Sequence, residues 1–298
     1  MPQLDPKRTE SRYHQVDERT DCSLELLYTG PSHGFTEWLT HGTGLYWIRG
    51  LPGSGKSTAM KYIFDDVRTS EALSESGHEG DWVAIGTFFL ARGAEIQKTL
   101  EGMLRSILLQ LLSKTTGFAM HLMFDIVMHH VPKPFTHPST DVQRNGSSDR
   151  SPYAWSQQSL QHALKAVLSH PQMRLSILLL VDAPDEHSGD HRSVATFLRT
   201  LAHYSEYPCV RCKVLVPSRD EIAFREVFCD DLFLDIHERT REDMRLLVDA
   251  KILRHPVMHG FYTQLFRKWY SKPRDKRRRL SSRHQASESG FDLSLKTC

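Results

Sequence analysis

The chain has 298 residues, which is enough to bury one large core or two modest ones. Apolar residues make up 39% and charged residues 25%, as in soluble globular proteins, and the net charge of +2 predicts no overall attraction to nucleic acid or membranes. The N-terminus lacks the apolar segment of a signal peptide, and no stretch is long enough to span a bilayer. We therefore expect an intracellular, cytoplasmic protein without a membrane or nucleic-acid partner.

The cysteines indicate thiols rather than disulfides. There are five of them, scattered and odd in number, which fits the reducing cytosol better than a disulfide framework. Cys209 and Cys212 form a lone C-x-x-C pair at the entrance to a predicted strand. A zinc site would need a second pair or histidines at ligand spacing, so the pattern favours two structural thiols.

The first regular elements flank a glycine-rich loop. We expect residues 1–33 to form an N-terminal extension. Residues 44–48 are aromatic and β-branched, which predicts a strand, and residues 58–64 predict a helix. Between them, Gly50–Ser57 fits the pattern G-x-x-x-x-G-K-[ST] at every fixed position. Strand, loop and helix together are the context that a phosphate-binding loop requires.

Each kind of residue in this loop has an expected role. The glycines allow a tight turn that points backbone N–H groups at a phosphate, and the positive end of the helix adds to the field. We expect Lys56 to contact the β- and γ-phosphates and Ser57 to ligate Mg²⁺. The alternative is a chance match in a glycine-rich turn. The candidate nucleotide-binding residues are Gly50, Pro52, Gly53, Ser54, Gly55, Lys56, Ser57 and Thr58.

The middle of the chain begins an alternation of strands and helices. Residues 69–81 are polar and contain glycine, which predicts a loop, and the nearly continuous apolar run 82–90 predicts a central strand covered on both faces. From Ile96 to Leu112 apolar residues recur every three or four positions, which predicts a long helix packed on the core. Residues 131–153 are rich in Pro, Ser, Thr and Asp, which indicates a surface excursion.

The second half continues the alternation. We expect helices over residues 156–170, 194–203 and 221–228, and strands over residues 175–181, 213–216 and 232–236. Thr240 is expected to be the N-cap of a further helix. Strands that alternate with helices predict an α/β fold of the P-loop NTPase type, with a parallel sheet covered by helices on both faces.

These elements predict one P-loop NTPase domain over residues 34–254. Regular patterns stop after Arg254, so we expect residues 255–298 to form a basic, poorly ordered tail, and both terminal extensions to be flexible. Six of the eight residues 272–279 are basic. Such a run predicts either a nuclear import signal or a solvated tail.

Asp182 is the candidate metal-binding acid. It follows the apolar run 178–181, and in P-loop folds this acid stands at the C-terminal end of a neighbouring buried strand. Mg²⁺ and its waters would offset the cost of burying a carboxylate there. The two expected Mg²⁺ ligands are therefore Ser57 and Asp182, and the expected bound nucleotides are ATP and ADP.

Three further residues are candidates for catalysis together with Lys56. Asp185 and Glu186 could orient and deprotonate the attacking water, and the alternative for each is a solvated acidic turn. Arg219 follows Ser218 at the end of a predicted strand, on the sheet edge where ligands bind. Its guanidinium could contact the γ-phosphate, and the alternative is a surface salt bridge.

The sequence gives less information on which nucleobase the loop would bind. Ras-type GTPases recognise guanine through an Asn-Lys-x-Asp segment, and the single asparagine of this chain, Asn145, lies in Asn-Gly-Ser. ATP is therefore the default expectation. GTP is kept as the alternative nucleotide, because other folds recognise guanine through backbone contacts.

With these residues in place, the chain resembles a NACHT-type NTPase of the STAND class, as found in fungal NOD-like receptor proteins. The likeness extends over residues 35–253 in successive blocks: 35–50, the helical segment 97–112, the Walker B segment 180–186 and the sensor segment 216–219. Two positions depart from the family pattern. Pro184 stands where a Leu-like residue is usual and Pro217 where a Ser-like one is, and either turn could be altered because proline fixes φ and removes an N–H.

The resemblance implies a nucleotide-driven switch that is closed with ADP, open and oligomerising with ATP, and reset by slow hydrolysis. Members of the family act in pathogen sensing, non-self recognition and programmed cell death, so the implied partners are further copies of the chain or other signalling proteins. The likeness ends after Ile252, before the helical, winged-helix and repeat regions of the family. A fragment of a longer receptor is therefore one interpretation.

Two other classes of function stay open. A catalytically weak or inactive fragment that acts by protein interaction would keep the fold but lack the elements that close over the nucleotide. A P-loop kinase acting on a small molecule would use the same loop. No acceptor site or lid has a recognisable pattern, and the acids at 185 and 186 favour water as the acceptor.

Overall fold

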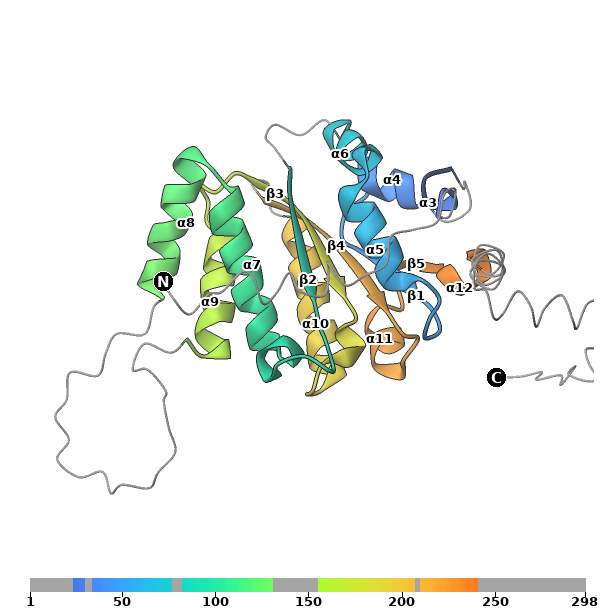
Figure 1. Ribbon diagram of the computed structural model, residues 1–298. Helices are drawn as coiled ribbons and strands as arrows, with labels where there is room; N and C mark the ends of the chain where they lie inside the picture. Colours follow the sequence, from blue (N-terminus) through green and yellow to red (C-terminus); the bar gives the residue numbers. More distant parts are fainter. Residues whose placement is uncertain (1–23, 30–33, 77–81, 131–154, 207–209, 241–298) are drawn as a thin grey trace, which may run out of the picture. The chain divides into compact units, whose positions relative to one another are not determined.

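The computed structural model describes residues 24–29, 34–76, 82–130, 155–206 and 210–240 (Figure 1). The chain divides into two units, residues 1–241 and 242–298, and every described residue lies in the first. The predicted excursion over 131–153, the helix expected from Thr240 and the basic tail lie outside the described residues.

The described part of the chain contains a five-stranded sheet. Its strands are β1 (Leu45–Arg49), β2 (Trp82–Phe88), β3 (Leu175–Asp182), β4 (Val210–Ser218) and β5 (Leu232–Asp235). They lie in the order β2-β3-β4-β1-β5, and every pairing is parallel. The carboxyl ends of parallel strands meet at one edge, so the segments that follow them are brought together there.

The helices are short to medium in length. They are α3 (Leu26–Thr29), α4 (Phe35–Thr40), α5 (Lys56–Asp65), α6 (Val67–Ser74), α7 (Leu100–Lys114), α8 (Gly117–His129), α9 (Gln157–Leu168), α10 (His191–Ala202), α11 (Ile222–Val227) and α12 (Ile236–Arg239). The described residues also form the 3₁₀ turns η1 (Glu95–Lys98), η2 (Pro184–Glu186) and η3 (His203–Glu206). Among the described residues, no helix combines the length and the apolar character that crossing a membrane requires.

Helices cover both faces of the sheet, as predicted (Figure 1). Successive residues of a strand point to opposite faces. In β3, Ile177 and Leu179 pack with helices α7 to α11, whereas Leu178 and Leu180 pack with α4, α5 and α6. Every residue of β3 is buried, which explains the continuous apolar run over residues 177–181.

Two predictions of local structure are wrong. The run 82–90 was expected to form a central strand, but β2 lies at the edge of the sheet and most of its residues are only partly buried. Residues 69–76 were expected to be a loop, but 67–74 form α6. The Asp66 side chain caps this helix by accepting from the Arg68 amide at 2.9 Å, and Ala72 and Leu73 are buried beneath it.

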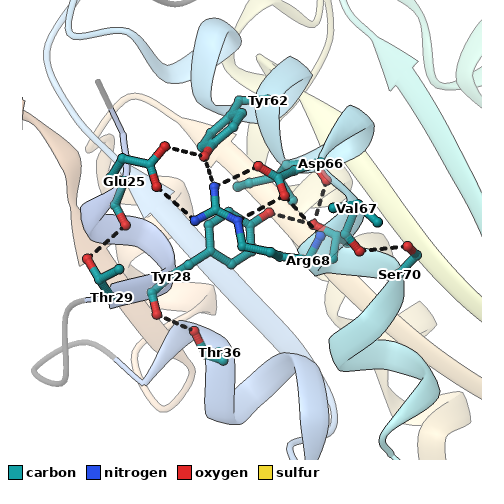
Figure 2. Close-up of polar contacts among 11 residues, drawn as sticks. Glu25, Tyr28, Thr29, Thr36, Tyr62, Asp66, Val67, Arg68 and Ser70 are labelled. Atoms are coloured by element: carbon teal, nitrogen blue, oxygen red, sulfur yellow. Dashed lines mark hydrogen bonds and ion pairs between the residues drawn. The ribbon is translucent and has the colours of Figure 1, made fainter. Parts of the chain in front are cut away.

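The N-terminal residues 24–29 pack on the corner between α5 and α6 (Figure 2). Arg68 forms ion pairs of 2.8 Å with both Glu25 and Asp66, and Tyr62 donates to Glu25 at 3.1 Å. The Arg68 hydrogen bond lowers the pKa of Asp66 to about 2, against the effect of burial. The end of α5 opposite the glycine loop is therefore held by residues 24–29.

Candidate functional site

The glycine loop connects β1 to α5, and its three glycines are needed for different reasons. Gly53 and Gly55 have φ values of 75° and 86°, in the left-handed region that side chains with a Cβ avoid. A Cβ on Gly50 would lie 2.6 Å from the Ser54 hydroxyl oxygen and 2.8 Å from a methyl carbon of Ile236. The loop can therefore take this compact form only with glycine at these positions.

Lys56 is the first residue of α5, and its ammonium group lies over the loop. Its Nζ donates to the carbonyl oxygens of Gly50 and Leu51, each at 2.8 Å. Burial lowers the pKa of Lys56, while the nearby carboxylates of Asp185 and Asp182 act in the opposite direction. The loop thus presents a cation, together with the N-terminal end of a helix, at the carboxyl edge of the sheet.

The other loop residues predicted from the sequence line the same segment. Ser57 and Thr58 lie in the first turn of α5 and are half-buried, whereas Pro52 is exposed. Ser54 is 7% exposed, and its hydroxyl oxygen has no hydrogen-bond partner among the described residues. A buried hydroxyl of this kind lowers the stability of the fold unless a further group forms a hydrogen bond with it.

Asp182 is the last residue of β3 and is 1% exposed. The sequence placed it at the end of a strand next to the loop strand, and this detail is wrong because β4 lies between β3 and β1. The C-terminal end of β4 instead links the residue after Asp182 to the start of the glycine loop. Pro217 O accepts from the Ala183 amide at 3.0 Å, and Ser218 O accepts from the Gly50 amide at 3.3 Å.

The two acids after Asp182 have different partners. Both oxygens of Asp185 face Arg219: Oδ1 accepts from the Arg219 amide at 3.2 Å, and Oδ2 lies 3.1 Å from Arg219 Nε. The Asp185 side chain is 3% exposed, and burial raises its pKa although Arg219 and Lys56 oppose this rise. Glu186 Oε2 instead accepts from the Ala91 amide at 2.8 Å, in the segment that follows β2.

Pro184 shapes this turn. It is the first residue of the 3₁₀ turn η2, and the preceding Ala183 has φ 51°, a left-handed conformation that is uncommon for a residue other than glycine. The Ala183 carbonyl accepts from the Glu186 amide at 2.9 Å. The turn sends Asp185 toward Arg219 and Glu186 toward the segment after β2.

Arg219 and Ser218 end β4. Ser218 is fully buried, and its hydroxyl accepts from Trp47 Nε1 at 2.7 Å and donates to the Arg219 carbonyl at 3.0 Å. The Arg219 side chain is half exposed and forms its ion pair with the buried carboxylate of Asp185. The salt bridge that was the alternative role of Arg219 is therefore present. Arg219 nevertheless lies near the glycine loop, because its charge lowers the pKa of Lys56.

The predicted acidic residues and Arg219 all lie close enough to Lys56 to affect its pKa. Asp185, Asp182, Arg219 and Glu186 all influence its pKa, in that order of strength. The residues come from the ends of β1, β3 and β4, as the sequence led us to expect. Sequence reasoning missed Ala91 as the partner of Glu186 and Thr240 as a partner of Ser54, because both contacts join distant segments through backbone atoms that carry no residue-specific pattern.

A family model described as "Nephrocystin 3, N-terminal" matches residues 31–219. The chain belongs to this family. The family is NACHT-related, so the resemblance to NACHT-type P-loop NTPases is confirmed. The nephrocystin 3 N-terminal match includes every candidate site residue from Gly50 to Arg219 and stops before α11.

Comparison with other proteins adds little to the family match. No curated protein matches the sequence significantly. Solved structures that resemble the fold include the crystal structure of Cdc6p from Pyrobaculum aerophilum, with 13% identity and a TM-score of 0.39. That similarity covers 76% of this chain and 48% of the other, so this chain spans about half of that protein.

Proposed function

We propose that this chain is a nucleoside-triphosphate-binding switch domain, which holds ATP or ADP with Mg²⁺ at the carboxyl edge of the sheet. The single observation that carries the proposal is the setting of Lys56. The glycine loop places this ammonium group at the start of α5, where Asp182, Asp185, Glu186 and Arg219 all influence its pKa. A cation, a helix N-terminus and inward backbone N–H groups are the means by which proteins bind phosphates.

The residues at this edge fit Mg²⁺. The ion prefers oxygen ligands and is commonly bound through one or two protein groups, with waters and substrate phosphates completing its octahedron. Asp182 and Ser57 would supply a carboxylate and a hydroxyl, and within the described ranges no group of three His, Cys, Asp or Glu side chains offers a cage made by the protein alone. When bound with the nucleotide, Mg²⁺ would neutralise phosphate charge.

The proposal includes slow hydrolysis, in which Asp185 and Glu186 have different tasks. Glu186 accepts a proton from the water that attacks the γ-phosphorus, and the bond from this phosphorus to the β–γ bridging oxygen breaks to leave ADP and phosphate. Asp185 accepts from the Arg219 amide with one oxygen and pairs with the guanidinium through the other, so we assign it to positioning that guanidinium near the γ-phosphate. Lys56 and Arg219 stabilise the negative charge that develops.

Phosphate release without any added acceptor tests this division. Glu186→Gln keeps an oxygen that can accept from the Ala91 amide but cannot take a proton, so turnover should fall about 10²–10⁴-fold, the usual contribution of a positioned base, with binding nearly unchanged. Asp185→Asn should lower turnover less. Loss of turnover in Asp185→Asn alone would reverse the assignment of the base. Turnover only with an added small-molecule acceptor would indicate a kinase.

A second candidate function is nucleotide binding without catalysis, in a domain that acts by protein interaction. The observation that favours it is the position of Glu186, which is bonded to the Ala91 amide and has the weakest influence on Lys56 of the three carboxylates. In this case wild type and Glu186→Gln would release phosphate at the same low rate.

The biological setting follows from the NACHT relationship and is part of the proposal. We place the chain in NOD-like receptor signalling of the fungal type, with roles in non-self recognition and programmed cell death, in the cytoplasm. ADP would hold the closed state and ATP the open state, and the partners would be further copies of the chain or other signalling proteins. GTP is the alternative nucleotide, and the run 272–279 is a candidate nuclear import signal.

A further inference from the structure

The glycine loop is contacted from the far end of the domain, 186 residues along the chain. The Thr240 hydroxyl donates to the Ser54 carbonyl at 3.1 Å, and both residues are buried. Thr240 follows α12, which begins directly after β5. The family match ends at residue 219, so Thr240 lies outside the matched region, whereas Ser54 lies inside it.

Two neighbouring contacts fasten the entry of the loop to the same segment. Arg49, the last residue of β1, forms a bidentate ion pair with Asp235, with Nη2 and Oδ2 2.7 Å apart. Ile236 packs on Gly50 so closely that a Cβ on the glycine would clash with it. The segment 235–240 therefore holds the loop at its entry, next to Arg49, and again at Ser54.

The contact at Ser54 determines the direction of one amide of the loop. A trans peptide is planar, so the carbonyl of Ser54 and the N–H of Gly55 point in opposite directions. A hydrogen bond that fixes the carbonyl toward Thr240 thus fixes the Gly55 N–H away from Thr240. Gly55 has φ 86°, and the absence of a Cβ allows this peptide to take orientations that another residue would resist.

Thr240 can also release the loop without being left unsatisfied. Its hydroxyl oxygen lies 3.0 Å from the carbonyl of Ile236, one turn back in α12, as well as 3.1 Å from the Ser54 carbonyl. A hydroxyl has a single proton. If the Ser54 carbonyl turns away, the Thr240 hydroxyl donates to the Ile236 carbonyl alone, in the common threonine bond to the i−4 carbonyl.

We propose that Thr240 is a positioning residue of the phosphate-binding loop: its hydroxyl holds the Ser54–Gly55 peptide so that the Gly55 N–H is directed at a phosphate of the nucleotide. A shift of Thr240 toward its second acceptor frees this peptide and weakens phosphate binding. The inference rests on the proposed nucleotide-binding function and adds a means of regulating it from the C-terminal end of the domain.

Calorimetric titration of the full chain with Mg·ATP tests the proposal. Thr240→Val keeps the shape of the side chain but removes the donor, and the loss of one hydrogen bond that preorganises the loop should raise Kd about three- to tenfold. Thr240→Ser restores the hydroxyl and should return Kd to within twofold of wild type. The control for the exchange itself is Thr200→Val in α10, which removes an exposed hydroxyl that donates to the i−4 carbonyl of Thr196 and should leave Kd unchanged.

The outcomes separate the inference from the function on which it rests. Wild type that does not bind Mg·ATP overturns both. Wild-type binding with an unchanged Kd in Thr240→Val overturns the inference alone, as does failure of Thr240→Ser to restore Kd, since the methyl group rather than the hydroxyl would then matter. Thermal unfolding without nucleotide should show that Thr240→Val and Thr240→Ser are both folded at the temperature of the titration, so that a rise in Kd confined to Thr240→Val cannot come from unfolded protein. Should Thr240→Val fail to fold, the Kd of Thr240→Ala relative to Thr240→Ser decides in the same way.

Discussion

Replacing Lys213 by Met should change how the stability of the domain depends on pH. Lys213 lies within β4, between the loop strand β1 and the strand β3 that carries Asp182, and it is 3% exposed. Its ammonium group donates to the carbonyls of Trp38, at 2.7 Å, and Leu39 at the C-terminal end of α4. The rings of Trp38 and Trp82 flank it. Burial lowers the pKa of Lys213 to about 8.

The sign and size of the effect follow from this shift. Below pH 8 both the folded and the unfolded chain hold the proton, and the folded state bears the full cost of the buried charge. Between pH 8 and the unfolded value of 10.5 the unfolded chain binds more protons, so the free energy of unfolding rises with pH. The difference between 10.5 and 8 corresponds to about 3 kcal/mol. This is an upper bound, because the two helix carbonyls stabilise the charged form.

Urea unfolding of wild type and Lys213→Met at pH 7, 8, 9 and 10 measures this contribution. Groups that titrate in both proteins, such as the buried Cys212 thiol, whose pKa burial raises to about 12, cancel in the comparison. The stability of wild type relative to the variant should rise by about 1–3 kcal/mol from pH 7 to pH 10. Lys165→Met, which removes an exposed lysine of α9, is the control for the loss of one charge. A difference between wild type and Lys213→Met that does not change with pH would refute the reasoning.

Two further predictions concern the loop and the acid. Gly55→Ala should weaken Mg·ATP binding by about tenfold and destabilise the fold by about 1–2 kcal/mol, because φ is 86° there; Gly86→Ala in β2, where a Cβ meets only ordinary contacts, should be close to neutral in calorimetry and thermal unfolding. Asp182→Asn should weaken Mg·ATP binding and turnover together, while nucleotide binding measured in EDTA should change less. Equal losses with and without Mg²⁺ would argue against a metal-holding role.

The sequence predicted the strands that have a distinctive composition. Residues 177–181 of β3 are a continuous apolar run and β1 is aromatic and β-branched, and both are strands at the expected positions. The error in β2 has a physical cause. Gln110 and Lys114 of α7 form hydrogen bonds with the backbone of β2, so this edge strand is covered by a helix and can be as apolar as a central strand. The helix α6 was missed because only Thr69, Ala72 and Leu73 are buried, and its polar residues resemble those of a loop.

The candidate site was predicted as a set but not in its contacts. The spacing of the glycine loop predicts Lys56 as a phosphate ligand, because few functions other than phosphate binding require that spacing. The insertion of β4 between the two site strands is a property of the sheet order, which hydrophobic pattern does not encode. The partners of Asp185 and Glu186 likewise depend on the turn at Pro184 and on backbone amides, for which sequence has no residue-specific signal.

The central claim is that this loop binds a nucleoside triphosphate through Lys56, and calorimetric titration with Mg·ATP tests it most directly. We expect wild type to bind, Lys56→Ala to lose at least tenfold in affinity because it removes the half-buried cation at the start of α5, and Lys165→Ala on α9 to bind as wild type does. The same titrations with Mg·ADP should rank the three proteins in the same order. Absence of binding by wild type, or equal binding by wild type and Lys56→Ala, would contradict the account.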